Sequence, residues 1–367
     1  MKKIIVLFSI LILGAISLTP AYAQDSNIPG VAATIKEVNE FEDNGISYYR
    51  ITLELEGEDV ISIIPKDSLI YTLDYKEGDK VKVNERTMDG ETIYDITDFR
   101  RTDSILILFI LFILITVLIG KLKGGLSLFG LGISFAVIFY YILPEILDGK
   151  NPVIVVILAS LLIIPVNYYI AHGFNYKSTY AVVSTLITLI ITGFLSTFFV
   201  SFSKLSGFAS DEARDLVNQT FGGVNIQNIL LASIIIGLLG ILDDITISQA
   251  SIAEQLKLTN KKIEFKELYF RTLEVGKDHI ASLVNTLILV YTSASLPLLL
   301  LVYKNYDGFI NTINDEMLAE EIVQMLLASI SLILAVPIST FISCYFIDRK
   351  DWYSKNKNLD NEHFHSH

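Results

Sequence analysis

Two adjacent carboxylates, Asp243 and Asp244, interrupt an apolar stretch of the sequence, GLLGILDDITISQASIAEQ at residues 237–255. An acid near the centre of a membrane-spanning helix is unfavourable by roughly 2.5 to 3.5 kcal/mol, so it usually faces protein or water and has a function. Neighbouring helical positions differ by about 100°, so the two side chains diverge. Asp244 shares one face with small and polar residues at steps of three and four: Ser233, Gly237, Gly240, Ser248, Ser251 and Gln255. We therefore predict that Asp244 points into the protein, while Asp243 lines an edge or reaches toward the inner interface.

The next long apolar segment, residues 279–303, carries a second polar stripe, which contains Asp278, Ser282, Asn285, Thr292 and Ser295. Asp244 and Asn285 each lie six residues from the inner ends of their segments, so both are expected about 9 Å inside the membrane. Asp244 is therefore predicted to face Asn285 and Thr286 across a hydrated pocket. Counting residues from the inner ends in the same way places Ser248 at the depth of Ser282 and Ser251 at the depth of Asp278.

Pro297 follows this stripe and lacks a backbone donor, so it frees carbonyl groups one turn earlier, at Ser293 and Ala294. In a membrane, broken backbone is acceptable only where protein or a water-filled cavity satisfies it. We predict a substrate or ion path along both stripes: Asp244, Asn285, Asp278, Ser248, Thr286, Gly240 and Pro297. The alternative is a polar seam with a structural kink that only holds the two helices together.

The sequence contains no phosphate-binding loop, metal-ligand cluster or nucleophilic serine motif, so we expect neither a cofactor nor a metal site. An intramembrane aspartyl protease needs two carboxylates that converge on one water. Asp243 and Asp244 diverge on one helix, although Asp244 and Asp278 on neighbouring helices could converge. We therefore expect that the protein is not an enzyme.

Weaker polar signals lie elsewhere. Asn167, after Pro165, and His172 could join the same cavity, but a lone asparagine in a helix usually bonds to a neighbouring helix. The alternating His363, His365 and His367 indicate a disordered tail rather than a metal site.

The composition indicates a multi-pass membrane protein, because 52% of the residues are hydrophobic and the mean hydropathy is +0.52. Charge is uneven along the chain. Residues 24–103 hold 19 Asp and Glu against nine Lys and Arg, which accounts for most of the net charge of −12. That acidity argues against a nucleic-acid partner, because nucleic acids select basic surfaces.

Residues 1–23 read as a signal peptide, with Lys2 and Lys3, an apolar run and small residues before a cleavage site after Ala23; the alternative is an uncleaved anchor. Residues 24–102 are then an acidic, extracytoplasmic β-rich domain. Alternation in ISYYRITLELEG places Tyr49, Ile51, Leu53 and Leu55 on one face, and EDNG, EGED and KEGDK mark turns. This spacing predicts a small β-barrel of OB-like or related type.

Residues 103–348 contain seven apolar segments, each long enough to span a membrane: 104–120, 126–143, 152–170, 179–201, 228–250, 279–303 and 322–347. An exported N-terminal domain makes the first segment run inward and leaves residues 349–367 as a cytoplasmic tail. The inner connections and tail then carry thirteen Lys and Arg, and the outer connections carry four. This bias supports that orientation. The single cysteine, Cys344, makes no internal disulfide.

Several segments resemble the YibE/F-like family of bacterial multi-pass membrane proteins. GLLGILDDITISQAS resembles the family's glycine-to-aspartate membrane motif, and GKDHIASLVNTLILVYTSASLPLLLL resembles its most distinctive segment. The earlier loops LPEILDGKNPV and GFNYKSTYA are similar as well, so the resemblance runs from about Lys76 to Leu301. The positions that match the family's motifs are Gly240, Asp244, Gly276, Asp278, Asn285, Thr286 and Pro297. Asp243 stands where the family pattern implies an apolar residue, and Lys277 where it implies arginine. The resemblance implies an architecture in the bacterial cell membrane and no established activity.

Two functions from different classes fit these features. The first is a transporter or permease for a small solute or ion, in which a buried carboxylate binds a proton or cation. The second is a membrane sensor or envelope assembly factor whose extracytoplasmic barrel binds a ligand or partner. The implied partners are the lipid bilayer, a small solute or cation, and a second copy or another membrane protein.

Overall fold

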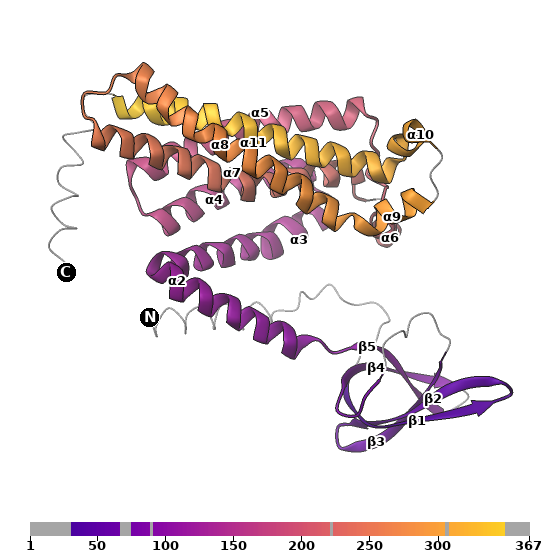
Figure 1. Cartoon of the computed structure of the whole chain (residues 1–367). Helices are drawn as coiled ribbons and strands as arrows, with labels where there is room; N and C mark the ends of the chain where they lie inside the picture. The colour runs from indigo at the N-terminus through magenta and orange to yellow at the C-terminus, as the bar shows by residue number, and fades with distance from the viewer. Residues whose placement is uncertain (1–30, 67–74, 89–90, 221–222, 305–307, 349–367) are drawn as a thin grey trace. The chain divides into compact units, whose positions relative to one another are not determined.

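The computed structural model describes residues 31–66, 75–88, 91–220, 223–304 and 308–348. The predicted signal peptide and the predicted C-terminal tail, with its three histidines, lie outside the described residues. The described residues divide into two compact units, with the boundary between Lys121 and Leu122. The first unit contains the strands, and the second contains most of the long helices (Figure 1).

Five antiparallel strands form one sheet in the order β3-β2-β1-β4-β5. Their bounds are β1 Val31–Asp43, β2 Ile46–Leu55, β3 Glu58–Pro65, β4 Lys80–Met88 and β5 Glu91–Phe99. Two predicted turns are confirmed. Asn44 and Gly45 join β1 to β2, and Glu56 and Gly57 join β2 to β3, all four with positive φ. Such two-residue turns match the twist of paired strands and favour asparagine and glycine.

The predicted buried face of the sheet is also confirmed: Ile51 and Leu53 are fully buried, Leu55 is buried, and Tyr49 packs against them. The predicted barrel does not close. Bulges at Ile35/Glu37 and at Lys82/Val83 curve the sheet. The edge strands β3 and β5 approach each other, but no strand pairing joins them in the described part of the chain. The domain is an open, curved sheet.

A long helix begins directly after the sheet. Helix α2 (Thr102–Val137) continues through a short π-helical segment, Ile138–Ile142, into α3 (Leu143–Leu147). Lys121 has φ 51° and ψ −134°, which breaks the helical path inside α2. Two predicted spans, 104–120 and 126–143, therefore fall on either side of this kink, in two helical parts that together make up 46 residues. The stretch is far longer than the roughly 20 residues that one crossing needs.

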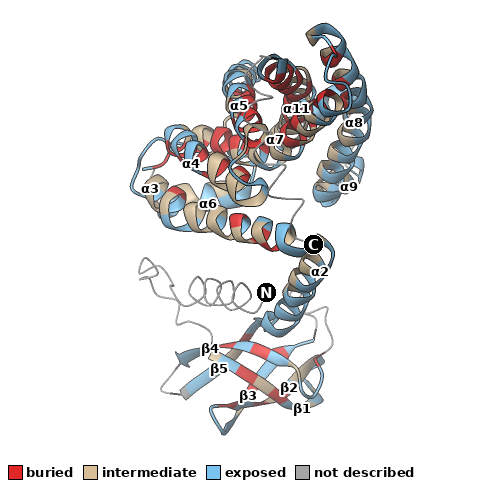
Figure 2. Ribbon diagram, turned by 90° about the vertical axis from the view of Figure 1, so that its left-hand side faces the viewer, coloured by how far each residue is buried: buried red, intermediate tan, exposed pale blue. Residues whose placement is uncertain are grey.

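The other helices form the rest of the second unit. They are α4 (Pro152–His172), α5 (Tyr176–Phe202), α6 (Asp211–Gln219), α7 (Ile226–Thr259), α8 (Phe265–Ala294), α9 (Leu296–Lys304), α10 (Phe309–Asn314) and α11 (Glu316–Asp348). Helices α5, α7 and α11 pack against one another, α4 packs on α5 and α7, and α8 packs on α7 and α11. Figure 2 shows the buried positions concentrated on α5, α7 and α11, whereas α8 and α9 are largely exposed.

Seven spans were predicted, and the described residues contain five helices that are long and apolar enough to cross a membrane, or six if α8 and α9 form one bent span. The difference has two causes. The first two predicted segments share one helical stretch, and the segment 279–303 is broken at Ser295 with a bend of 67°. Pro297, the second residue of α9, explains that break, as the sequence predicted.

Candidate functional site

The structure places Asp244 on the surface of the bundle, which corrects the prediction that it points inward. Asp244 is exposed, as are the residues above it on the same face, Ser233, Gly237 and Gly240. A Cβ added at Gly240 would meet no atom within 4 Å, so this face makes no close helix contact there. The apolar residues decided the orientation of α7: its buried face is lined by Leu238, Leu242, Ile245 and Gln249.

The predicted partner residues on α8 also lie on an outer face. Asn285, Thr286, Asp278 and Ser282 are all exposed, and Thr286 Oγ1 donates to the carbonyl of Ser282 in its own helix at 3.0 Å. Asn285 is nine residues beyond Gly276, which places it about 180° from that buried glycine. The structure therefore does not bring Asp244 and Asn285 together.

Two other predicted positions have different surroundings. Ser248 is half-buried on α7, and Ser251, one turn later, donates to the carbonyl of Ile247 at 2.7 Å. Asn167 bonds to another helix: its Nδ2 donates to Ser134 Oγ of α2 at 2.9 Å. His172 lies at the end of α4 within electrostatic reach of Asp244.

The neighbouring acid, Asp243, is the one that enters the protein. Its side chain is half-buried, and its Oδ1 atom is fully buried with no hydrogen-bond partner among the described residues. The hydroxyl of Tyr168 on α4 lies within hydrogen-bonding reach of the Asp243 carboxyl group, and it donates to the Asp243 carbonyl oxygen at 3.4 Å. Asp243 was expected to line an edge or to reach toward the inner interface, because that prediction followed the small residues of α7 rather than the apolar ones.

Three buried hydroxyl groups meet beside Asp243. Tyr168 Oη lies 2.6 Å from Thr185 Oγ1 of α5, Thr185 Oγ1 lies 2.8 Å from Thr246 Oγ1 of α7, and Tyr168 also bonds to Thr246. Thr185 and Thr246 each reach the carbonyl one turn back in their own helix as well. These three hydroxyl groups, which we call the hydroxyl triangle, join α4, α5 and α7. Together with the two backbone carbonyls they offer more acceptors than donors, so each hydroxyl proton has a partner without water.

A stripe of hydroxyl groups continues along α5 on the buried side. Ser184, Thr188, Thr192 and Ser196 are fully buried, and each hydroxyl donates to the carbonyl four residues before it. Because their protons are used inside the helix, these oxygens remain available only as acceptors. The spacing of four is visible in the sequence and could have identified α5. Tyr168 carried no comparable signal.

Gln249 forms a second polar contact toward α8 and α11. Thr340 donates to Gln249 Oε1 at 3.0 Å, and Ser339 donates to the carbonyl of Thr246 at 3.0 Å. Gln249 is fully buried, and its Nε2 atom has no hydrogen-bond partner among the described residues. Gly276 of α8 covers this amide closely: a Cβ there would lie 3.0 Å from both Nε2 and Oε1.

Long apolar helices around buried hydroxyl, amide and carboxyl groups are typical of an α-helical multi-pass membrane protein. The chain belongs to the YibE/F-like family, whose model matches residues 108–349. The family predicted from the sequence is therefore confirmed, and the matched range contains the buried polar groups but not the five strands. Comparison with curated proteins and with solved structures found no match to this chain.

Within the described ranges, no group of three or more His, Cys, Asp or Glu side chains is arranged to hold a metal ion. The candidate site is the Asp243 carboxylate with the hydroxyl groups of Tyr168, Thr185 and Thr246 beside it. This arrangement can accept a proton or a small cation and can pass a proton between adjacent oxygens.

Proposed function

We propose that this protein is a permease that moves protons or a small cation across the bacterial cell membrane, with Asp243 as the binding carboxylate. One observation carries the proposal: Asp243 Oδ1 is buried within a spanning helix and has no hydrogen-bond partner among the described residues. Burying a charged oxygen without a partner is costly. A proton or a cation would supply that partner, and intramembrane acids commonly mark ion or proton paths.

The hydroxyl triangle supports a role in passing the proton. Tyr168 and Thr246 both contact the Asp243 carbonyl oxygen, and Tyr168 also interacts with the Asp243 carboxylate, so it connects that carboxylate to Thr185 of α5.

Ion flux through the purified, full-length protein in liposomes tests this role. Asp243→Asn should lower proton or cation flux about tenfold or more, because the amide cannot exchange a proton at that site. Asp243→Glu, which retains the carboxylate, should keep part of the flux. Asp244→Asn is the matched control, because it removes an exposed acid one position away. Unchanged flux in Asp243→Asn would contradict the role of Asp243. A wild-type protein that moves neither protons nor Na⁺ nor K⁺ would contradict the permease.

The proposed orientation has the five-stranded domain outside the cytoplasm and the end of α11 inside, and the distribution of Lys and Arg supports it. Phe174, between α4 and α5, and Phe208, before α6, are exposed and lie on opposite sides in this orientation. In a Cys344→Ser background, an impermeant maleimide should label Phe208→Cys in intact spheroplasts and Phe174→Cys only after permeabilisation. The reverse pattern would invert the topology.

A second function is favoured by the edge strand β3. Ile61 and Ile63 are 54% and 52% exposed there, and exposed apolar side chains on an edge strand are typical of a binding surface. The domain would then recruit a ligand, a second copy or an envelope partner for a sensor or assembly factor. Deleting residues 24–101 separates the two functions: rescue of a null strain by the remaining helices supports the permease, and loss of rescue with normal flux supports the sensor or assembly factor.

A further inference from the structure

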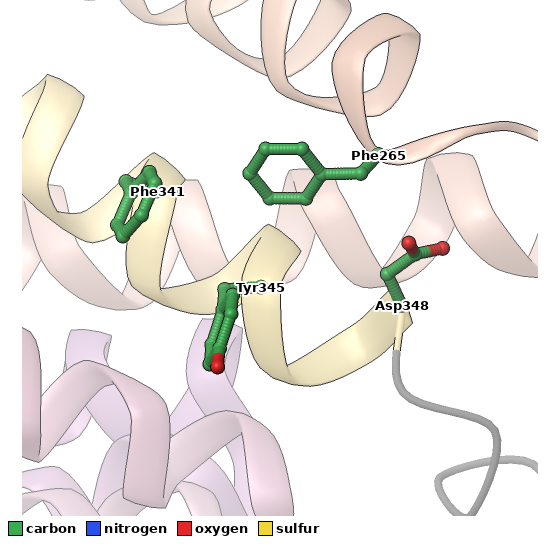
Figure 3. A pocket seen from close by; sticks show the side chains of 4 residues that line it. All are labelled: Phe265, Phe341, Tyr345 and Asp348. Carbon is green, nitrogen blue, oxygen red and sulfur yellow. The ribbon is translucent and has the colours of Figure 1, made fainter.

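A pocket of about 450 Å³ lies where α8 begins and α11 ends, away from Asp243. Phe265, Phe341, Tyr345 and Asp348 line it. Figure 3 shows the rings of Phe265 and Phe341 on either side of the pocket, with Tyr345 below them and the Asp348 carboxylate near Phe265. Its volume falls within the range that holds a small ligand.

The rings present their faces in two directions. Phe265 and Phe341 have centroids 5.9 Å apart and nearly perpendicular planes, and Phe341 and Tyr345 have centroids 6.1 Å apart and nearly parallel planes. The negative face of an aromatic ring attracts a cation within about 6 Å of its centroid. Rings at right angles allow one cation to contact more than one aromatic side chain.

Asp348 adds a carboxylate to this pocket. Lys257 Nζ donates to Asp348 Oδ1 at 2.9 Å and to the carbonyl of Ile263 at 2.8 Å, so the lysine is held from the other side. Lys257 therefore orients the carboxylate through Oδ1, and the Asp348 side chain is still 38% exposed.

Aromatic residues also collect at membrane interfaces without binding anything specific. That explanation accounts for the 52% exposure of Phe341 and the 41% exposure of Tyr345, but it requires neither a concave arrangement nor an acid among the rings. Aromatic faces together with a carboxylate are the chemistry that recognises organic ammonium ions.

We propose that this pocket binds a small organic ammonium group, either a free amine solute or the amine-bearing headgroup of a lipid. The site is separate from Asp243 and does not depend on ion flux. Its specificity comes from the ring faces of Phe265, Phe341 and Tyr345, and Asp348 orients the charged end of the ligand.

Equilibrium dialysis of radiolabelled choline against the full-length protein in dodecyl maltoside, a detergent without an ammonium group, tests the proposal. The competitor is 3,3-dimethyl-1-butanol, which has the shape of choline without its charge. Choline should bind, and the neutral alcohol should compete at least about tenfold less well, because only the cation gains from the ring faces. Equal competition by the alcohol would show an unspecific apolar hollow and would overturn the proposal.

Variants assign the binding to the rings. Phe341→Leu keeps an apolar side chain without a ring and should weaken choline binding about tenfold, while Phe341→Trp should retain it. Phe270→Leu is the matched control, because Phe270 is exposed on α8 and does not line the pocket. Wild-type binding by both Phe341→Leu and Tyr345→Leu would overturn the proposal. The thermal stability of each variant shows whether a loss of binding reflects misfolding.

Competition by short-chain lipids distinguishes the two sources of the ammonium group. If the natural ligand is a headgroup, a phosphatidylethanolamine should displace choline and a phosphatidylglycerol of equal chain length should not. If it is a free solute, neither lipid should displace it, and choline binding should persist. Displacement by phosphatidylglycerol alone would overturn recognition of an ammonium group.

Discussion

Gly276 of α8 lies so close to Val336 of α11 that a Cβ added at the glycine would be 2.5 Å from Val336 Cγ1. That distance is shorter than any ordinary contact between side chains. The same Cβ would lie 3.0 Å from both polar atoms of the buried amide of Gln249 on α7. A single missing side chain therefore sets the distance between three helices.

Gly276→Ala should destabilise the protein, because the methyl group forces α8 away from α7 and α11. Overpacking of this kind typically costs about 1–3 kcal/mol. Cys344 provides the measurement: it is the only cysteine in the chain and is fully buried, so a thiol-reactive dye reports unfolding as the temperature rises. Gly237→Ala is the control, because its added Cβ would meet no atom within 4 Å. Equal melting temperatures for both variants would show that α8 adjusts freely.

The hydroxyl triangle should contribute to stability through Thr246, which bonds to Tyr168 and Thr185 on two other helices. Thr246→Val keeps the shape of the side chain and leaves both partners with one acceptor fewer. Interhelical hydrogen bonds in membrane proteins contribute roughly 0.5 to 2 kcal/mol, so the variant should melt earlier in the same thiol assay. Thr197→Val on α5 removes a hydroxyl that bonds only to its own helix and should have little effect. A larger effect at Thr197 would contradict the importance of the triangle.

The sheet was predictable from the sequence because its signals are local. The alternation of apolar and polar residues predicted the buried face that contains Ile51 and Leu53. Asn44 and Gly45 predicted the turn in which both residues have positive φ. Whether β3 and β5 would pair depends on the curvature of the whole sheet. That property is distributed over many residues and has no local pattern.

The candidate site was predicted one residue away from its position in the structure. Small residues at regular spacing suggested the face of Asp244, yet the bundle buried the more apolar face that includes Leu242 and Ile245. In a chain this apolar, every face of a helix looks suitable for burial, so the sequence period cannot decide between them. The partners of Asp243 come from α4 and α5, and their proximity follows from packing between helices far apart in sequence.

The stability of the five-stranded domain should depend on pH through Asp98. Arg101 and then the backbone N–H of Phe99 donate to this carboxylate and hold its pKa below the ordinary value of 3.8. A group with a lower pKa in the folded state stabilises the fold above its unfolded pKa, and this contribution is lost as the pH falls through the folded value. The protection factors of the amides in β4 and β5, which are exchange rates corrected for the intrinsic pH dependence of exchange, should therefore fall below about pH 4.

Asp98→Asn should flatten that dependence, because the amide does not titrate. The matched control is Thr92→Val, an exposed position on the same strand, which changes no titratable group and should preserve the pH profile of the wild type. If the profile of Asp98→Asn still steepened below pH 4 to the same extent, other carboxylates would control the acid stability of the sheet.

The ion pair between Lys257 and Asp348 should respond unequally to removal of its two members. The Lys257 side chain is only 10% exposed, whereas the Asp348 side chain is 38% exposed. Asp348→Asn leaves a nearly buried ammonium group with fewer partners, and removing one member of a buried pair is strongly destabilising. Lys257→Met instead retains the apolar stem and leaves a carboxylate that water can solvate.

Heating followed by size-exclusion chromatography should therefore show a larger loss of folded protein for Asp348→Asn than for Lys257→Met. Lys277→Met, which breaks an exposed pair with Glu274, should behave like the wild type. The opposite order for the first two variants would mean that Lys257 is solvated in the membrane-embedded protein.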